Sequence, residues 1–453
     1  MAEQNQSVGF VSLGCPKATV DSELIITDLR ARGYEVDAAD DTQDTLVINT
    51  CGFIDAAKAE SYAAIEDGLN AGKRVIVTGC LGKDAQALRA RFPQLEFVSG
   101  PADVSPVVAA VQHYKPIQET DALDVTQTLY AQHEARVRLT PPHYAYVKIS
   151  EGCNHTCAFC IIPDMRGKLR SRNFDDLLAE AQSAVDAGTQ ELLLVGQDLS
   201  AYGLDLKYAG TDKTPRSDLY HLAAALGEIA PWVRLHYVYP YPSVDQLIPL
   251  MADGHILPYL DIPLQHAQPR LLKAMRRPAA AEKTLERIQR WREICPELAI
   301  RSTFIVGFPG ETDEDVGTLL DFLQAAELDR VGCFTYSAVA GARANDLPNH
   351  VDERDKLDRQ ERVYEVQAEI SAQRLARHVG RKIRVIVDEI SDDTICARSM
   401  WDAPDIDGHV WIERPSHGAI PKTGEFVWVT VDSADEYDLY ATYDGNRAIV
   451  SPS

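Results

Sequence analysis

The chain has 453 residues, of which 45% are hydrophobic and 25% are charged, a balance that excludes a largely disordered protein. Its length exceeds what one ordinary core accommodates, so we expect two to four domains. Acidic residues outnumber basic ones by 68 to 45, and the net charge of −23 disfavours tight, nonspecific binding to a phosphate backbone. No apolar run approaches the ~18 residues of a membrane span, and the polar N-terminus lacks a signal-peptide layout. We therefore expect a cytoplasmic protein with no membrane partner.

The first part of the chain alternates between apolar β-type runs and amphipathic stretches. Candidate strands lie at 8–13, 46–50, 74–78 and 96–98. Apolar residues recur at helical spacing between them. This alternation predicts a parallel sheet covered by helices. We expect this N-terminal domain to span 1–117 and a polar linker without periodicity to span 118–138.

A second alternating block covers residues 139–378. Candidate strands lie at 144–149, 191–195, 233–239, 259–262, 300–306 and 331–336. Six βα units in ~200 residues predict an open, partial (β/α)6 barrel, with its chemistry at the C-terminal ends of the strands. Residues 379–453 change to β-type runs separated by turn residues, which predicts a small β-barrel. The fold class is therefore α/β with a small C-terminal β-barrel.

The strongest motif is a C-x3-C-x2-C loop, Cys153-Asn-His-Thr-Cys157-Ala-Phe-Cys160, placed just after the first strand of the second block. Random placement would give well under ~0.01 such matches in a chain of this length. Closely spaced soft thiolates suit an iron–sulfur centre with one open iron. Structural zinc normally has four protein ligands, so His155 inside the loop leaves zinc open as an alternative.

Cys15, Cys51 and Cys80 lie far apart in the sequence but share one context. Each follows an apolar strand by one or two residues and adjoins a glycine. Parallel strands end at the same edge of a sheet, where ligands usually bind. We therefore expect these thiolates to meet at one point and hold a second cluster, the alternative being that three buried cysteines merely pack. The remaining cysteines lack ligand spacing and are interpreted as structural: Cys295, Cys333 and Cys396.

The loop, with the aromatic Phe159 before its last cysteine, resembles the radical S-adenosylmethionine (AdoMet) superfamily. The resemblance implies a [4Fe-4S] cluster whose open iron binds AdoMet and whose electron cleaves it to a 5′-deoxyadenosyl radical. It also implies AdoMet contacts from Phe159 in the loop, from Gln197 and Gln265 at strand ends, and from Arg301. The alternatives are ordinary strand termini and, for Arg301, a solvated ion pair.

Both sets of cysteines together resemble the methylthiotransferase family over nearly the whole chain, and the C-terminal barrel resembles its TRAM domain. The resemblance implies two [4Fe-4S] clusters, with six catalytic, metal-binding cysteines: Cys15, Cys51, Cys80, Cys153, Cys157 and Cys160. Cys15-Pro-Lys17 and Cys51-Gly-Phe-Ile54 resemble the branch that attaches a methylthio group to the β-carbon of an aspartate in small-subunit ribosomal protein S-twelve. Ala18 and the loop Ala338–Arg343 depart from that branch, and the loop puts substrate contacts in doubt.

Charge gives an independent indication of the partner. Residues 381–453 hold 7 basic and 14 acidic side chains, a net of −7. An acidic barrel suits a basic ribosomal protein better than transfer RNA, although acidic surface can also serve only solubility. We expect S-twelve as the substrate, possibly within the ribosome, together with an electron donor and no stable tRNA binding. The alternatives are a tRNA methylthiotransferase acting on a modified adenosine and a non-catalytic metal-binding ribosome-associated factor.

Overall fold

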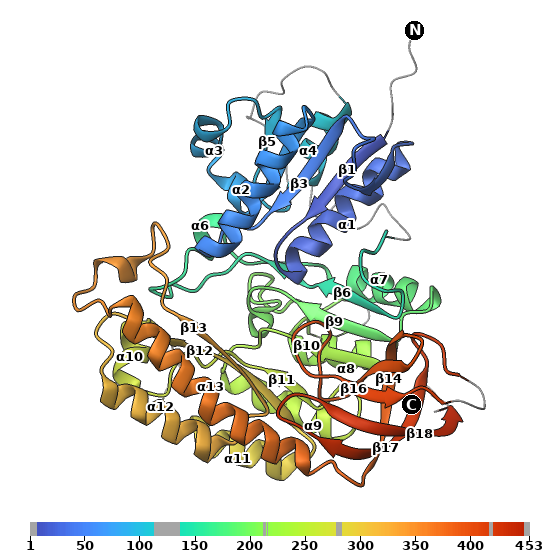
Figure 1. Ribbon diagram of the computed structural model, residues 1–453, viewed down its shortest axis with the longest axis vertical. Helices are drawn as coiled ribbons and strands as arrows, with labels where there is room; N and C mark the ends of the chain where they lie inside the picture. The colour runs from blue at the N-terminus through green and yellow to red at the C-terminus, as the bar shows by residue number, and fades with distance from the viewer. Residues whose placement is uncertain are drawn as a thin grey trace.

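The computed structural model describes residues 7–112, 136–211, 214, 216–277, 283–415 and 420–447. Along the chain lie a helix-covered parallel sheet, a larger open sheet with helices, and a small closed barrel (Figure 1). This arrangement confirms the predicted fold class. Most of the expected linker, 118–135, lies outside the described residues. No helix in the described ranges is long and apolar enough to cross a membrane.

The N-terminal sheet is parallel throughout and has the strand order β2-β1-β3-β4-β5. Its strands are β1 Ser7–Ser12, β2 Glu35–Ala38, β3 Thr45–Thr50, β4 Arg74–Gly79 and β5 Phe97–Val98. Its helices are α1 Pro16–Ala31, α2 Asp55–Asn70, η1 Leu81–Lys83, α3 Ala85–Arg91 and α4 Val104–Gln112. Only β2 was not predicted, because this short edge strand buries Val36 alone and lacks an apolar pattern.

The central sheet is an open parallel barrel with the order β13-β12-β11-β10-β9-β6. Its strands are β6 Tyr144–Lys148, β9 Glu191–Val195, β10 Trp232–Leu235, β11 Tyr259–Asp261, β12 Ala299–Val306 and β13 Arg330–Thr335. The helices are α6 Ile162–Arg166, α7 Phe174–Asp186, η2 Leu199–Ala201, α8 Leu219–Gly227, η3 Pro242–Gln246, α9 Leu247–Ala252, α10 Pro269–Ala274, α11 Thr284–Ile294, α12 Asp313–Ala326 and η4 Arg343–Asp346. A short antiparallel pair, β7 Ser150–Glu151 and β8 Arg170–Ser171, flanks the cysteine loop. All six predicted strands are present.

The long helix α13, Glu353–Ala376, leads into the closed barrel β14-β15-β16-β18-β17. Its strands are β14 Lys382–Ile390, β15 Thr394–Ser399, β16 Val410–Glu413, β17 Phe426–Ala434 and β18 Leu439–Arg447. The core of this barrel continues into Trp232, Tyr259 and Ala299, the first residues of β10, β11 and β12. The small barrel therefore packs against the amino-terminal ends of the central strands and leaves their carboxyl ends free.

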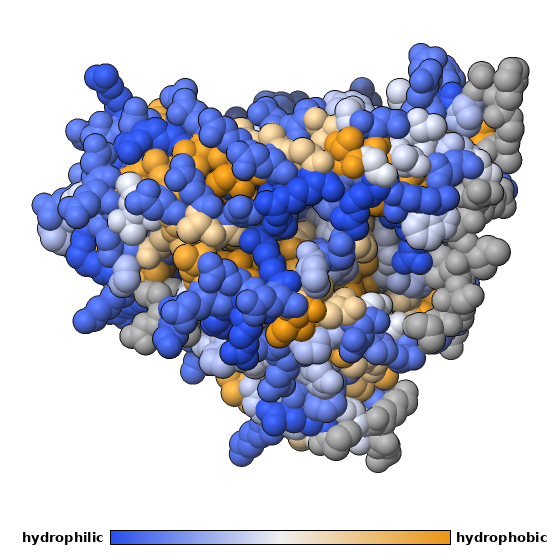
Figure 2. Space-filling model, turned by 90° about the horizontal axis from the view of Figure 1, so that it is seen from below, coloured by the Kyte–Doolittle hydropathy of each residue, from blue (hydrophilic) through white to orange (hydrophobic). Residues whose placement is uncertain are grey.

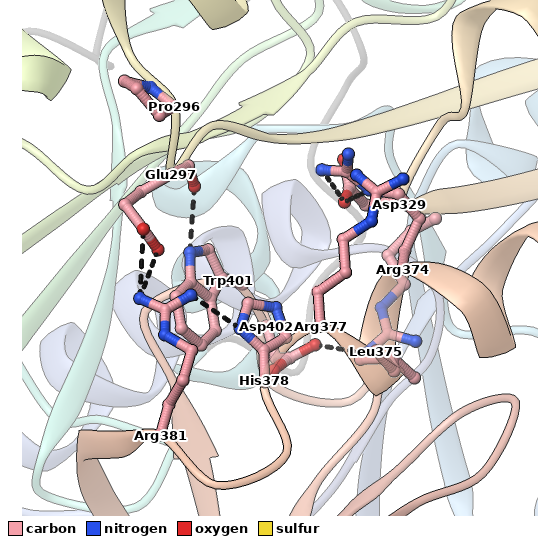
Figure 3. A pocket seen from close by; sticks show the side chains of 11 residues that line it. Pro296, Glu297, Asp329, Arg374, Leu375, Arg377, His378, Arg381, Trp401 and Asp402 are labelled. Carbon is pink, nitrogen blue, oxygen red and sulfur yellow. Dashed lines mark hydrogen bonds and ion pairs between the residues drawn. The ribbon is translucent and has the colours of Figure 1, made fainter.

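Polar contacts fix this packing. Arg381 Nη2 donates to both carboxylate oxygens of Glu297 at 3.0 Å, and Trp401 Nε1 donates to the Glu297 carbonyl at 2.9 Å (Figure 3). The His378 ring stacks on Trp401 with centroids 3.9 Å apart.

Viewed from below, hydrophilic side chains cover most of the surface and hydrophobic ones gather in patches between them (Figure 2).

A buried carboxylate joins the central sheet to the C-terminal barrel. Glu191, at the start of β9, accepts hydrogen bonds of 2.7 Å from Arg234 Nε and from Arg398 Nη1. All three side chains are at most 1% exposed. Because burying a charge is costly unless it is paired, this triad constrains how the two domains meet.

Replacing Glu191 with alanine should destabilise the fold. Glu191→Ala leaves two buried guanidinium groups without their shared carboxylate, and we expect a loss of about 3–5 kcal/mol, seen as a lower midpoint of thermal unfolding by calorimetry. The control is Glu228→Ala, since Glu228 is 57% exposed and pairs only with half-exposed His255. The control should change stability by about 0.5 kcal/mol or less. Equal midpoints for the two variants would contradict a structural role for the triad.

Candidate active site at two cysteine trios

The N-terminal trio, defined as Cys15, Cys51 and Cys80, lies at one edge of the N-terminal sheet. Strands β1, β3 and β4 are neighbours in that sheet, and one cysteine follows each of them. A Cβ placed on Gly14 would lie 3.6 Å from Cys51 Sγ, and the Cys80 N–H donates to the carbonyl of Thr50 at 3.0 Å. The structure thus brings together three residues that the sequence separates by 65 positions.

Glycine is required beside the third cysteine. Gly79 has φ of +94°, and a Cβ there would lie 2.3 Å from Asn49 Oδ1 and 2.4 Å from the carbonyl oxygen of Thr50. No side chain fits this space, so the chain can turn into Cys80 only with glycine at position 79. The glycine that adjoins Cys80 in the sequence therefore has a steric reason.

The loop trio, defined as Cys153, Cys157 and Cys160, lies between β7 and α6. The Cys157 Sγ is 3.3 Å from the Tyr239 hydroxyl and 3.8 Å from Arg277 Nη1. Arg277 also lies over the Tyr239 ring, 3.7 Å from its centroid. A tyrosine and an arginine from the barrel therefore hold the middle cysteine of the loop.

His155 has other partners. Its Nε2 lies 2.7 Å from Asp198 Oδ2, and its ring stacks on Tyr239 with centroids 4.0 Å apart. Within the described ranges, no group of three or more His, Cys, Asp or Glu side chains is arranged to hold a single metal ion. The ring of His155 is thus engaged by Asp198 and Tyr239, and the three thiolates of the loop are the donor set that suits an iron–sulfur cluster.

Arg166 contacts the N-terminal trio from the central domain. It ends α6, six residues after Cys160, and its Nε donates to Cys80 Sγ at 3.3 Å. Its Nη1 lies 3.1 Å from each carboxylate oxygen of Glu151 and 3.4 Å from Asp21 Oδ2. Lys148 completes the group by pairing with Glu151 at 2.8 Å and with Asp21. In Figure 1, α6, which follows the loop trio in the chain, lies between the N-terminal sheet and the central barrel.

The donor chemistry of both trios fits an anionic iron–sulfur cluster. Burial raises the pKa of the Cys80 and Cys153 thiols to about 11 and that of Cys160 to about 12, so binding a cluster there must release protons. Although burial opposes it, the cations Lys17 and Arg166 lower the pKa of Cys15. Each trio also has an arginine with a buried nitrogen that lacks a hydrogen-bond partner among the described residues: Arg166 Nη2 and Arg277 Nε.

Three of the four predicted AdoMet contacts lie past the carboxyl ends of barrel strands or within the cysteine loop. Phe159 packs on a cluster that includes Leu271. Gln197 follows β9 and donates from Nε2 to Glu151 Oε1 at 2.8 Å, which ties it to the Arg166 group. Gln265 follows β11, is buried, and has φ of +71°. Their proximity to AdoMet stays a prediction.

Arg301 is placed differently from our expectation. It lies near the amino-terminal end of β12, and its Nη1 pairs with Asp407 Oδ1 of the C-terminal barrel at 2.9 Å. Barrel chemistry lies at the opposite strand ends. The expected role of Arg301 at the AdoMet carboxylate is therefore not supported, and its geometry is that of a domain contact.

Sequence reasoning missed Arg166 and Arg277. Neither has a fixed spacing from the cysteine it contacts, because 86 residues separate Arg166 from Cys80 and 120 separate Arg277 from Cys157. No local pattern could have identified them.

Comparison with known proteins follows the same three-part division. Residues 7–100 match the model described as "Uncharacterized protein family UPF0004", residues 147–323 match the radical SAM superfamily, and residues 379–443 match the TRAM domain. A protein of Azoarcus sp. (strain BH72) named ribosomal protein uS12 methylthiotransferase RimO is 54% identical over 437 residues, covering 96% of this chain and 97% of that protein. This chain belongs to the radical SAM uS12 methylthiotransferase family. The predicted family resemblance is confirmed, and with it a radical SAM methylthiotransferase enzyme.

Other members of the uS12 methylthiotransferase family match as fully. Proteins of the same name from Rhodospirillum rubrum and Marinobacter nauticus are 52% and 54% identical, covering 98% and 97% of this chain and 100% and 96% of theirs. Among solved structures, the radical S-adenosylmethionine methyltransferase TsrM from Kitasatospora setae, with cobalamin and a [4Fe-4S] cluster bound, matches with a TM-score of 0.51. It is 15% identical, with 73% of this chain and 75% of that chain covered, so it supports the fold alone.

A glycine substitution beside Cys80 should destabilise the site. Gly79→Ala and Gly72→Ala both place a side chain at positive φ, but nothing lies within 4 Å of a Cβ at Gly72. Backbone strain should lower the free energy of unfolding of both variants by ~1 kcal/mol. Overpacking should lower that of Gly79→Ala by a further ~1–3 kcal/mol. Calorimetry on the two variants measures the difference. Identical unfolding midpoints would show that the turn into Cys80 is not sterically constrained.

Proposed function

We propose that this protein attaches a methylthio group to the β-carbon of an aspartate in ribosomal protein uS12 (S-twelve). Its family membership supports the activity, and one structural observation supports the two-site arrangement. Arg166, six residues after the last cysteine of the loop trio, donates a hydrogen bond to Cys80 of the N-terminal trio at 3.3 Å. This contact supports the proposal that the two sites lie near each other at the carboxyl end of the barrel, where radical and sulfur chemistry can meet.

We propose that Cys153, Cys157 and Cys160 hold one [4Fe-4S] cluster and that the N-terminal trio holds a second. When bound, the clusters and AdoMet supply a 5′-deoxyadenosyl radical and a methylthio sulfur. Such chemistry suits the substrate, because the β C–H bond of an aspartate is too weakly acidic for a side-chain base near neutral pH. Phe159, Gln197 and Gln265 are the proposed AdoMet contacts.

The chain's own residues hold this geometry. Tyr239 and Arg277 fix Cys157, while the His155–Asp198 contact of 2.7 Å fixes the loop around it. Arg166 has its positive charge matched by Glu151 and Asp21, so it can remain buried beside Cys80. All six cysteines are partly or fully shielded from solvent, which limits access of water to reactive species.

We further propose functional units at 1–117 for the second cluster, 139–378 for the radical chemistry and 379–453 for the TRAM barrel, with 118–138 as linker. The acidic barrel, at −7 over residues 381–453, is suited to hold basic uS12. The enzyme also needs an electron donor. No observation favours stable tRNA binding or the tRNA alternative.

Substituting one cysteine in each trio should separate the two sites. Cys157→Ala should abolish 5′-deoxyadenosine formation, whereas Cys51→Ala should abolish only sulfur insertion. After anaerobic reconstitution, each variant should hold ~4 Fe per chain against ~8 for the wild type. We would measure the iron content of each variant and the amount of 5′-deoxyadenosine that it forms. Mass spectrometry of uS12 would detect the added methylthio mass.

Cys396→Ala is the matched control, because Cys396 lies in the C-terminal barrel on β15. It should keep full iron and full activity. Methylthiolated uS12 from either trio variant would contradict the assignment. Modification of bulk tRNA instead of uS12 by the wild type would favour the tRNA alternative, and zinc in place of iron would favour the non-catalytic one.

A further inference from the structure

Lys17 is a cation held at the boundary between the N-terminal domain and the central barrel. It follows Cys15 by two positions, and its Nζ lies 3.5 Å from the centroid of the Tyr237 ring in the central barrel. Within the part of the chain that the structure describes, Lys17 forms no ion pair with an Asp or Glu side chain. A shielded cation that contacts an aromatic ring and has no carboxylate partner can bind an anion.

The position of Lys17 does not favour helix stability. It lies in the first turn of α1, which contains no acidic residue. The helix dipole makes that end positive, so a lysine there is unfavourable by roughly 0.3–1 kcal/mol. Helix stability therefore does not explain a charge at this position, and its place between Cys15 and Tyr237 indicates a role at the site instead.

The barrel holds Tyr237 in an unusual conformation. Tyr237 follows β10 with φ of +59°, and Gln265 follows the neighbouring β11 with φ of +71°. Left-handed backbone in residues other than glycine is strained and tends to occur at functional sites. The Tyr237 N–H donates to Asp261 Oδ2 at 3.1 Å, and this contact holds the strained turn in place. Lys17 and Tyr237 thus form a contact built by two domains.

The nearby charges define what Lys17 can bind. Arg166 also lies near Cys15, but Glu151 and Asp21 already match its charge. In the proposed reaction, the carbon that loses hydrogen and gains sulfur carries the carboxylate of the substrate aspartate. The reacting carbon is bonded directly to the carbon of this carboxylate. A cation that binds the carboxylate therefore also fixes the reacting carbon beside the N-terminal trio.

We propose that Lys17, supported by the Tyr237 ring, binds the carboxylate of the target aspartate and selects aspartate over neutral side chains. This inference rests on the proposed function. The competing possibility is that Lys17 only balances the negative charge of a cluster held by Cys15. The two differ in what the lysine recognises, so they can be separated by changing the substrate rather than the enzyme alone.

The test compares reconstituted full-length wild type, Lys17→Met and Lys17→Arg. Two probes are used, uS12 and a uS12 variant with asparagine at the modified position, and affinity is measured by fluorescence anisotropy. Lys17→Met should bind uS12 about 10- to 100-fold more weakly, the range expected for a lost charged hydrogen bond, while its affinity for the asparagine form stays unchanged. Lys17→Arg should recover part of the loss. Iron content should equal that of the wild type in both.

Lys83→Met is the matched control, because Lys83 follows Cys80 by three positions and is exposed. It should bind both probes like the wild type. Unchanged affinity of Lys17→Met for uS12 would overturn the inference, and so would an equal loss for both probes, with or without loss of iron. Failure of the proposed function is a separate result: the wild type would then leave uS12 unmodified, whatever Lys17→Met binds.

Discussion

The buried ionic group of Asp21, Lys148, Glu151 and Arg166 is the constraint on which the site depends. Two cations and two carboxylates share a space where their side chains are at most 7% exposed. Such a group is costly to desolvate and tolerates little displacement, since removing one member leaves a buried charge uncompensated. Asp21 belongs to the N-terminal domain and the others to the barrel. The charge balance therefore holds only when the two domains meet in one arrangement.

That arrangement sets the relation between the two trios. Arg166 can reach Cys80 because α6 begins just after the loop trio and ends at the domain boundary. Gln197, at the end of β9, joins the same group through Glu151. One ionic network thus contacts the N-terminal trio and a predicted AdoMet contact, and its member Arg166 lies six residues after Cys160. A shift of either domain would disturb both sites together. The network therefore keeps the two sites in a fixed relation, which a reaction that combines their products requires.

The sequence predicted what depends on local pattern and missed what depends on domain packing. Apolar runs located the strands, and strand–glycine–cysteine placement located the N-terminal trio, because parallel strands must end at a common edge. The edge strand β2 was missed because it buries one side chain. Arg301 was correctly placed on a strand, but its interaction with Asp407 depends on a domain 106 residues further along the chain. The partners of Arg166 were unpredictable for the same reason.

The net charge of the chain is negative, whereas the charges beside the cysteines are positive. The first bears on docking of the substrate protein and the second on the chemistry of the site. The chain carries −23 overall and −7 in its C-terminal barrel, which packs on the amino-terminal ends of the central strands. At the opposite ends, the cysteines have cations beside them: Lys17 and Arg166 at the N-terminal trio and Arg277 at the loop trio. An acidic exterior attracts a basic protein, whereas a cationic interior favours thiolates and carboxylates. A basic protein whose modified side chain is itself an acid is complementary to both regions at once.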